Sequence, residues 1–208
     1  MKHALIIGAT GGIGTALAKE MKDDYTLTLV GRDTQKLRAL KDFGNVVPTD
    51  VASELEVQAL LEECTPIDVL IYSAGAIQPE LLKMLNQDAF YRVIDANLTG
   101  LIFTLKYAEA KLNKGARVFV LGARPELITY RGFSVYAAAK AGVKAVVDIA
   151  NIEMKKKADF TLVLPKAVNT DFWGNVGTPP KDALKPAEVA GAILESLQGE
   201  SEEVLKVG

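Results

Sequence analysis

The stretch that most constrains the fold of this chain is residues 4–14, where four apolar residues lead into a turn rich in glycine. Gly8, Gly11, Gly12 and Gly14 leave little side chain in this turn, and the apolar pattern that follows has helical spacing. The pattern predicts a strand, a tight turn and a helix. Because the first N–H groups of a helix are unpaired, a turn without side chains lets a pyrophosphate approach the backbone closely. We therefore predict a dinucleotide site here, with a plain strand-to-helix turn as the alternative.

Apolar runs that read as buried strands alternate with segments of helical periodicity along the whole chain. Strands are expected at 4–7, 26–30, 45–47, 67–72, 117–121, 160–164 and 204–207, and helices at 14–22, 34–43, 53–63, 87–112, 133–154 and 186–197. This alternation predicts an α/β fold, a doubly wound, Rossmann-like parallel sheet of six to seven strands with helices on both faces. The 208 residues show no change of composition that would mark a boundary, so we expect a single domain over residues 1–208.

Composition excludes several classes of function. The formal net charge of −2 leaves no basic surface for nucleic acid. A single cysteine rules out an internal disulfide, and a single histidine argues against a histidine-based triad or metal site. No apolar run has the length of a membrane span, and the first strand begins too early for a signal peptide. We expect a cytoplasmic protein without a metal, a membrane or a nucleic-acid partner.

The end of the second strand bears on the choice of cofactor. Gly31 is followed by Arg32 and Asp33. At this point of a mononucleotide-binding unit an acid holds the ribose 2′-hydroxyl of NAD, whereas an arginine accommodates the 2′-phosphate of NADP. Arg32 therefore favours NADP(H) over NAD. Asp33 fits NAD, but it is equally well explained as the cap of the next helix.

Later strand ends also carry small or polar residues. Asp50 and Val51 follow the third strand, where Asp50 could contact the adenine edge or cap the helix of residues 53–63. Ser73, Ala74 and Gly75 follow the fourth strand. Because ligands bind beyond the carboxyl ends of parallel strands, we expect these segments to meet at one crevice.

Two features of the later helices indicate chemistry. Asn97 and Gly100 interrupt the helix of residues 87–112, so Asn97 either offers a polar group to a bound water or marks a harmless kink. Tyr136 and Lys140 are four residues apart at the start of the helix of residues 133–154. This spacing puts both side chains on one face, where an ammonium lowers a phenol pKa and creates a general acid and base. The same spacing also occurs by chance on many helices.

Taken together, these residues resemble the short-chain dehydrogenase/reductase family, nearly from end to end. The matching elements are Gly8, Gly12 and Gly14, Asp50-Val51, Ser73-Ala74-Gly75, Asn97 with Gly100, Tyr136 with Lys140, and the segment from Pro165 to Thr170. The resemblance implies an oxidoreductase that transfers hydride between NADP(H) and a small carbonyl or alcohol. Tyr136 would exchange the proton, Lys140 would lower its pKa and hold the nicotinamide ribose, and Asn97 would anchor a water on the proton path.

The resemblance also assigns the cofactor site. Thr10 would lie in the phosphate turn, and Val168 and Thr170 would hold the carboxamide and phosphate region. The full set of expected cofactor residues is Gly8, Thr10, Gly11, Gly12, Ile13, Gly14, Arg32, Asp50, Val51, Ser73, Ala74, Gly75, Tyr136, Lys140, Pro165, Val168 and Thr170.

The chain departs from the family pattern at four places. Ile7 replaces a threonine before the glycine turn, Tyr72-Ser73 replaces two asparagines, and Lys166 replaces a glycine after Pro165. The fourth departure is the most serious, because Ala123 occupies the position of the catalytic serine.

The missing hydroxyl of Ala123 leaves two functions open. Ser134 and Thr129 are the first candidates to replace it, followed by Tyr130 and Ser73, with Arg124 as another electrophile. In that case the chain is an active reductase or dehydrogenase. Alternatively, it is a weak or inactive NADP-binding sensor or interaction protein on the same fold.

Pocket walls and assembly are also expected from the resemblance. The candidate substrate-pocket residues are Ala123, Arg124, Ser134, Phe172 and Trp173. Leu101, Phe103 and Val147 would lie on the exteriors of the two long helices, which favours a homodimer or homotetramer, although core burial explains these residues equally well.

Overall fold

The computed structural model describes all residues 1–208 and contains one parallel sheet. Its strands are β1 (Lys2–Ile7), β2 (Tyr25–Gly31), β3 (Asn45–Pro48), β4 (Ile67–Tyr72), β5 (Leu112–Leu121), β6 (Ala158–Pro165) and β7 (Val204–Val207). They lie in the order β3-β2-β1-β4-β5-β6-β7, and every neighbouring pair is parallel. The predicted doubly wound α/β fold is confirmed, with seven strands.

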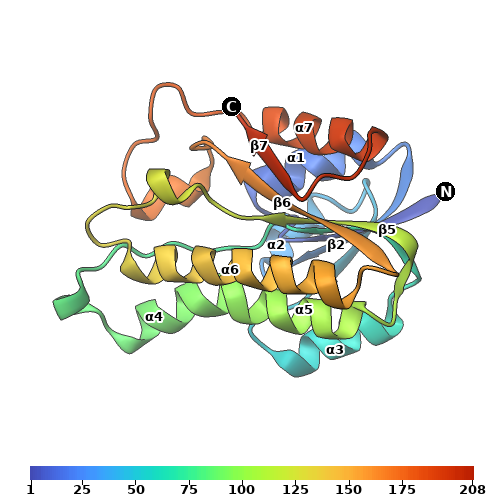
Figure 1. Ribbon diagram of the computed structural model, residues 1–208, viewed down its shortest axis with the longest axis horizontal. Helices are drawn as coiled ribbons and strands as arrows, with labels where there is room; N and C mark the ends of the chain where they lie inside the picture. Colours follow the sequence, from blue (N-terminus) through green and yellow to red (C-terminus); the bar gives the residue numbers. More distant parts are fainter.

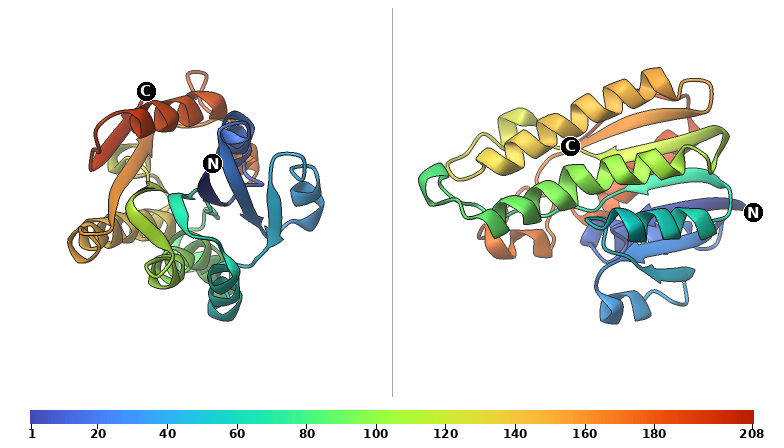
Figure 2. Two further views of the ribbon diagram at one scale, coloured as in Figure 1. Left: turned by 90° about the vertical axis from the view of Figure 1, so that its right-hand side faces the viewer. Right: turned by 90° about the horizontal axis from the view of Figure 1, so that it is seen from below.

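Helices cover both faces of this sheet (Figures 1 and 2). They are α1 (Gly12–Met21), α2 (Thr34–Arg38), α3 (Glu54–Glu63), α4 (Gln87–Ile94), α5 (Gly100–Ala108), α6 (Ser134–Glu153) and α7 (Pro186–Gln198). Helices α3, α5 and α6 lie side by side on one face, and α1 and α7 lie on the other. Short 3-10 turns occur at Leu82–Met84, Pro125–Leu127 and Asp171–Asn175.

The core has two halves, one on each face of the sheet. In β1, Leu5 and Ile7 pack into the half under α3, α5 and α6, whereas Ala4 and Ile6 pack into the half under α1 and α7. Successive side chains of a strand point to opposite faces, so a central strand buried on both sides must be apolar throughout. This explains the uninterrupted apolar run that precedes the glycine turn.

Two predicted helices differ from the structure. The helix expected at 34–43 ends at Arg38, and the chain reaches β3 through turns. The helix expected at 87–112 is divided into α4 and α5 by a π-helical turn at Asp95–Thr99, and it ends at Ala108, so that Leu112 begins β5. The interruption at Asn97 was predicted from the sequence, but its π-helical form was not.

Tyr72 explains why the π-helical turn is tolerated. Its buried hydroxyl donates a hydrogen bond to the Ala96 carbonyl oxygen at 2.9 Å, within the turn. A Cβ on Gly100 would lie 2.6 Å from that hydroxyl and 2.7 Å from the Val51 side chain. Gly100 is therefore required by the close approach of β4 to this helix, and the Tyr72 hydroxyl adds a buried hydrogen bond to the π-helical turn.

The residues expected on the helix exteriors are in the core instead. Leu101 and Val147 are fully buried, and Phe103 packs against the same half of the core. The apolar residues that these helices expose are Ile102 on α5 and Ile149 and Ile152 on α6, with 44%, 52% and 72% of their surface accessible. No helix combines the length and the apolar composition needed to cross a bilayer.

Candidate functional site

A cavity of about 730 Å³ opens at the carboxyl ends of the central strands. Strands β1 and β4 are neighbours although two strands separate them in sequence, so the connections leave this point in opposite directions. Such a switch point leaves a crevice beyond the strand ends. Residues that follow β1, β4, β5 and β6 line the cavity, together with the start of α6 and the segment around Asp171–Asn175.

The glycine turn is shaped by close backbone contacts. Gly8 has a positive φ of 88°, and a Cβ on it would lie 2.5 Å from the backbone nitrogen of Ala74. A Cβ on Gly14 would collide with the Gly8 carbonyl oxygen. Gly11 is the N-cap of α1 and supplies no side-chain cap, so the first N–H groups of this helix remain available to an anion. The turn fits the pyrophosphate of a dinucleotide.

The far side of this turn is closed by the segment after β6. A Cβ on Gly12 would lie 2.5 Å from the methyl group of Thr170. The Thr170 hydroxyl accepts a hydrogen bond from the backbone N–H of Phe172 at 3.3 Å. Thr170 therefore packs directly against the glycine turn and starts the segment that walls the cavity.

Basic residues at the end of β2 lie near the same cavity. Asp33 caps α2 by accepting hydrogen bonds from the backbone N–H groups of Gln35 and Lys36, which settles its structural role. Arg32 is exposed and does not line the cavity, whereas Lys36 does. The Lys36 ammonium lies 3.3 Å from a carboxylate oxygen of Asp171, so this ion pair joins α2 to the segment that closes the cavity. Lys36 was missed, although a cation one turn after Arg32 was a usable signal.

Asp50 and Val51 do not line the cavity. Asp50 accepts a hydrogen bond from the backbone N–H of Ala52 at 3.1 Å, and its own N–H donates to Glu56. The N-cap of α3 is Ser53, so the alternative that Asp50 caps this helix is wrong. Val51 is buried in the core.

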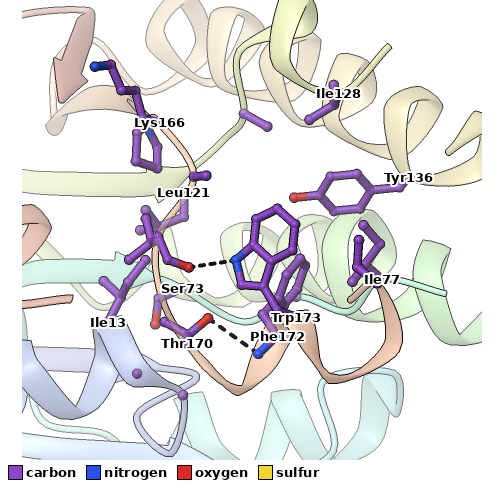
Figure 3. Close-up of a pocket in the computed structure, with 18 of the residues that line it drawn as sticks. Ile13, Ser73, Ile77, Leu121, Ile128, Tyr136, Lys166, Thr170, Phe172 and Trp173 are labelled. Atoms are coloured by element: carbon purple, nitrogen blue, oxygen red, sulfur yellow. Dashed lines mark hydrogen bonds between the residues drawn. The ribbon is translucent and has the colours of Figure 1, made fainter. Parts of the chain in front are cut away.

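Tyr136 and Lys140 lie on one face of α6, and both line the cavity. The Tyr136 hydroxyl points into the cavity (Figure 3). The Lys140 ammonium lies 5.7 Å from the centre of the Tyr136 ring and donates a hydrogen bond to the Leu121 carbonyl oxygen at 2.8 Å. Burial lowers the pKa of Lys140 to about 8 and raises the pKa of Tyr136. In the absence of a bound cofactor, both shifts follow from burial of the two groups.

Asn97 lies just behind the cavity and is almost fully buried. Its side-chain nitrogen donates to the carbonyl oxygens of Ala76 and Val93, at 2.7 and 2.8 Å. Its side-chain oxygen has no partner. A Cβ on Gly75 would lie 2.8 Å from this oxygen and 4.0 Å from the Lys140 ammonium. The absence of a side chain at Gly75 therefore keeps open a space between two polar groups.

Three of the four hydroxyls considered as replacements for the missing serine at Ala123 are not free in the cavity. Thr129 donates to the Pro125 carbonyl oxygen, and Ser73 donates to the Ile7 carbonyl oxygen. The Ser134 hydroxyl is buried without a partner and does not line the cavity. Tyr130 does line it, but its side chain is 63% exposed.

The side chains of Arg124 and Lys166 are directed away from the Tyr136 hydroxyl or bound to the backbone. The Arg124 guanidinium donates to the backbone carbonyl oxygens of Leu164, Val207 and Gly208, which ties the loop after β5 to β6 and β7. The Lys166 side chain points away from Tyr136 (Figure 3). Arg124 therefore acts as a structural cross-link, and the expectation that it serves as an electrophile loses its support.

Aromatic rings surround the Tyr136 hydroxyl. We call Tyr130, Phe133, Tyr136, Phe172 and Trp173 the aromatic wall, because all five line the cavity. The rings of Tyr130 and Phe133 are 5.9 Å apart, those of Phe133 and Tyr136 are 6.2 Å apart, and those of Tyr136 and Phe172 are 5.8 Å apart. The Trp173 indole N–H donates to the Val168 carbonyl oxygen at 2.9 Å, which holds the ring against the cavity (Figure 3).

Most residues expected at the site line this one cavity. They are Thr10, Gly11, Gly12, Ile13, Gly14, Ser73, Ala74, Gly75, Ala123, Arg124, Tyr136, Lys140, Pro165, Val168, Thr170, Phe172 and Trp173. The expected residues that do not line it are Gly8, Arg32, Asp50, Val51, Asn97 and Ser134. The lining residues that sequence reasoning missed include Lys36, Ile77, Leu127, Ile128, Phe133, Asp171 and Val176. Most of these are apolar loop residues without a motif, so only the fold could bring them together.

Comparisons with known proteins agree with this architecture. The family model described as short chain dehydrogenase matches residues 2–181. An uncharacterized oxidoreductase of Staphylococcus haemolyticus is 27% identical over 93% of this chain and 90% of its own length. A crystal structure from Thermus thermophilus, assigned as a short-chain oxidoreductase, has a TM-score of 0.88 and 36% identity, over 99% of this chain and 100% of that one. An alcohol dehydrogenase of Thermococcus sibiricus, complexed with 5-hydroxy-NADP, has a TM-score of 0.85 and 26% identity, over 100% and 96% of the two chains.

Proposed function

Because this chain belongs to the short-chain dehydrogenase/reductase family, we propose that it is an NADP(H)-dependent oxidoreductase that interconverts a small carbonyl compound and its alcohol. The observation that carries the proposal is the position of the Tyr136 hydroxyl. It points into the same cavity that the glycine turn lines, and Lys140 lies one helical turn away. One cavity thus holds a phosphate-binding turn and a group that can exchange a proton.

The residues around the cavity fit a nicotinamide dinucleotide. Gly11 and Gly12 would receive the pyrophosphate at the start of α1, with Thr170 above it. Arg32 and Lys36 would approach the ribose 2′-phosphate, because a phosphate attracts basic side chains strongly. NADPH supplies the hydride when it is bound. The alcohol dehydrogenase from Thermococcus sibiricus, which was solved with 5-hydroxy-NADP, supports NADP as the cofactor.

Tyr136 is the proposed general acid. Because burial raises its pKa, the phenol is protonated near neutral pH and can give its proton to a carbonyl oxygen. An ammonium group has three donors, and Lys140 uses one of them on Leu121, so two remain for ribose hydroxyls or water. The unpaired oxygen of Asn97 lies beside this ammonium across Gly75 and can hold a water that returns a proton to Tyr136.

Ala123 supports a second candidate function, an NADP-binding sensor or interaction protein with little turnover. Loss of one donor to a developing oxyanion costs about 10² to 10³ in rate. None of Ser73, Thr129 and Ser134 offers a free hydroxyl to the cavity. If the protein binds NADPH but transfers no hydride to a broad set of carbonyl compounds, this second function replaces the first.

The test compares Tyr136→Phe with the wild type in NADPH oxidation driven by carbonyl compounds. We expect kcat to fall by about 10² to 10⁴, the usual contribution of a general acid, while the Kd of NADPH changes little. Tyr91→Phe is the control, because Tyr91 is exposed on α4 and does not line the cavity. Unchanged turnover in Tyr136→Phe would remove Tyr136 from the mechanism.

We also propose that the protein is a cytoplasmic homodimer or homotetramer. Ile102, Ile149 and Ile152 expose apolar surface on two helices that lie side by side (Figure 2). Burial of such a surface favours association. Sedimentation of Ile152→Glu against the wild type tests this, and an unchanged mass would argue against this face as the contact.

A further inference from the structure

The side chains around the Tyr136 ring are mostly aromatic or aliphatic, and the polar groups beside them are the Tyr130 hydroxyl and the Lys140 ammonium. The aromatic wall lines this part of the cavity together with Ile77 and Ile128; Tyr136, Phe172, Trp173 and the two isoleucines are labelled in Figure 3. Phe133 and Phe172 pack against the Tyr136 ring at 6.2 and 5.8 Å between ring centres. A substrate group that reaches the Tyr136 hydroxyl must therefore lie among aromatic faces and edges.

Three polar side chains near this region already donate hydrogen bonds to the backbone, and the free donors of Lys140 are assigned to the cofactor ribose. The Ser73 hydroxyl donates to Ile7, and the Trp173 indole N–H donates to Val168, both at 2.9 Å. The Arg124 guanidinium is bound to carbonyl oxygens of the last two strands. A substrate with several hydroxyl groups would lose its hydrogen bonds to water here without finding new partners, which is costly for each buried polar group.

We propose that the substrate is an aryl aldehyde or an electron-poor aryl ketone; this inference rests on the proposed oxidoreductase function. An aromatic ring gains from offset and edge-on contacts with the aromatic wall. The carbonyl is then the main polar group of the substrate, and the Tyr136 hydroxyl points into the cavity where it can meet that carbonyl (Figure 3). The carbonyl carbon accepts the hydride of NADPH and the oxygen accepts the proton of Tyr136, which gives an alcohol and NADP⁺.

The alanine at position 123 is the reason why we expect the substrate carbonyl to be electron-poor. Two hydrogen-bond donors normally stabilise the negative charge that develops on the substrate oxygen. In this chain the second donor is missing, because Ala123 has a methyl group in place of the serine hydroxyl. A substituent on the ring that withdraws electrons reduces this charge within the substrate itself. The reaction therefore depends more steeply on ring substituents than it would with a serine at this position.

Trp173 provides a measurement of binding that does not need turnover. It is the single tryptophan of the chain and it lines the cavity, so its fluorescence reports on this site alone. The protein with NADP⁺ is titrated with benzamide and, separately, with acetamide, which are unreactive and differ in the ring. We expect a saturable change with benzamide and none with acetamide over the same concentration range.

Matched variants locate the binding. Phe172→Leu removes a ring that contacts Tyr136 and should weaken benzamide binding about 3- to 10-fold, as expected for one aromatic contact. Phe90→Leu is the control, because Phe90 lies on α4 outside the cavity. Equal responses to benzamide and acetamide, or no response to either, would overturn the proposal, and so would a loss of affinity in the control alone.

Kinetics separate this inference from the proposed function. NADPH oxidation is measured with 4-nitrobenzaldehyde, benzaldehyde, 4-methoxybenzaldehyde and glyceraldehyde. We expect kcat/KM to fall in that order. Faster turnover of glyceraldehyde would overturn the aryl substrate and leave the oxidoreductase intact, and equal rates for the three benzaldehydes would overturn the requirement for an electron-poor carbonyl. Benzamide binding without any turnover would support the aryl pocket and overturn the oxidoreductase.

Discussion

The Lys140 ammonium donates a hydrogen bond to the Leu121 carbonyl oxygen at 2.8 Å, so α6 is joined to the carboxyl end of β5. The accepting carbonyl belongs to Leu121, two residues before Ala123, so the bond holds a buried cation close to that residue. Ala123 is the position at which the family has its serine. Burial lowers the pKa of Lys140 to about 8. The charge of this residue therefore changes within an accessible range of pH.

The first prediction concerns stability and pH. In the unfolded chain Lys140 has an ordinary pKa of about 10.4, so between pH 8 and pH 10 the unfolded state binds more protons than the folded state. The contribution of Lys140 to the free energy of unfolding therefore rises with pH in this window. We expect chemical denaturation to show the wild type gaining stability relative to Lys140→Met from pH 8 to pH 10.

The difference between the two proteins levels off above about pH 10, because the unfolded lysine then also loses its proton. Above that pH, tyrosines lower the stability of both proteins alike. Burial raises the pKa of Tyr72 and Tyr136, so their contribution to stability is lost once the unfolded chain ionises. Lys144→Met is the control, since Lys144 is an exposed lysine of the same helix. A stability difference between the wild type and Lys140→Met that does not vary with pH would contradict this account.

The second prediction restores the missing donor. Ala123 lines the cavity, and Ala123→Ser places a hydroxyl at the family position. We expect kcat/KM for an unactivated ketone to rise by about 10-fold or more, up to the 10³ that such a donor supplies elsewhere. Ser134→Ala is the comparison, because the Ser134 hydroxyl is outside the cavity and its loss should not lower the rate. If Ser134→Ala abolishes turnover, Ser134 is the substitute for the missing serine.

The third prediction tests cofactor choice through Arg32. Its side chain is exposed at the start of α2 and makes no ion pair with a carboxylate, so it is free to bind the 2′-phosphate of NADPH. We expect Arg32→Ala to raise the Kd of NADPH by about 10- to 100-fold, the usual effect of a charge-assisted hydrogen bond, and to leave the Kd of NADH unchanged. Fluorescence of the reduced nicotinamide measures both constants. Equal losses for the two cofactors would place Arg32 away from the 2′-phosphate.

The fourth prediction concerns the ion pair between Lys36 and Asp171. Both side chains are more than half exposed, so the pair contributes little to stability. Asp171 nevertheless competes with the phosphate of a bound cofactor for the Lys36 ammonium. We expect Asp171→Asn to lower the Kd of NADPH by up to about 5-fold, and Lys36→Met to cancel this gain in the double variant. If Asp171→Asn strengthened NADPH binding equally in the wild type and in Lys36→Met, the Asp171 carboxylate would act by repelling the cofactor and not by occupying Lys36.

The sequence predicted the backbone of the site better than its side chains. The glycine turn and Ser73-Ala74-Gly75 were assigned to one crevice because parallel strands end at one edge of the sheet, and the segment from Pro165 to Thr170 was added by the family resemblance. Local patterns carry that information. Whether a side chain is free depends on distant partners, and Arg124, for example, is bound to strands some forty and eighty residues away in sequence. The hydrogen bonds of Arg124 and the absence of a partner for the Ser134 hydroxyl could therefore be recognised only in the three-dimensional structure.

The last prediction concerns Tyr72, where the family has asparagine. Its hydroxyl donates to the Ala96 carbonyl oxygen within the π-helical turn. Tyr72→Phe keeps the ring and its packing but removes this buried hydrogen bond, which we expect to cost about 0.5 to 1.5 kcal/mol in the free energy of unfolding. Chemical denaturation measures the loss, and Tyr91→Phe on the exposed side of α4 is the control with no expected change. Equal stability of the two variants would mean that Ala96 finds another donor and that Tyr72 is kept for its packing, since its ring fills the core beneath Gly100.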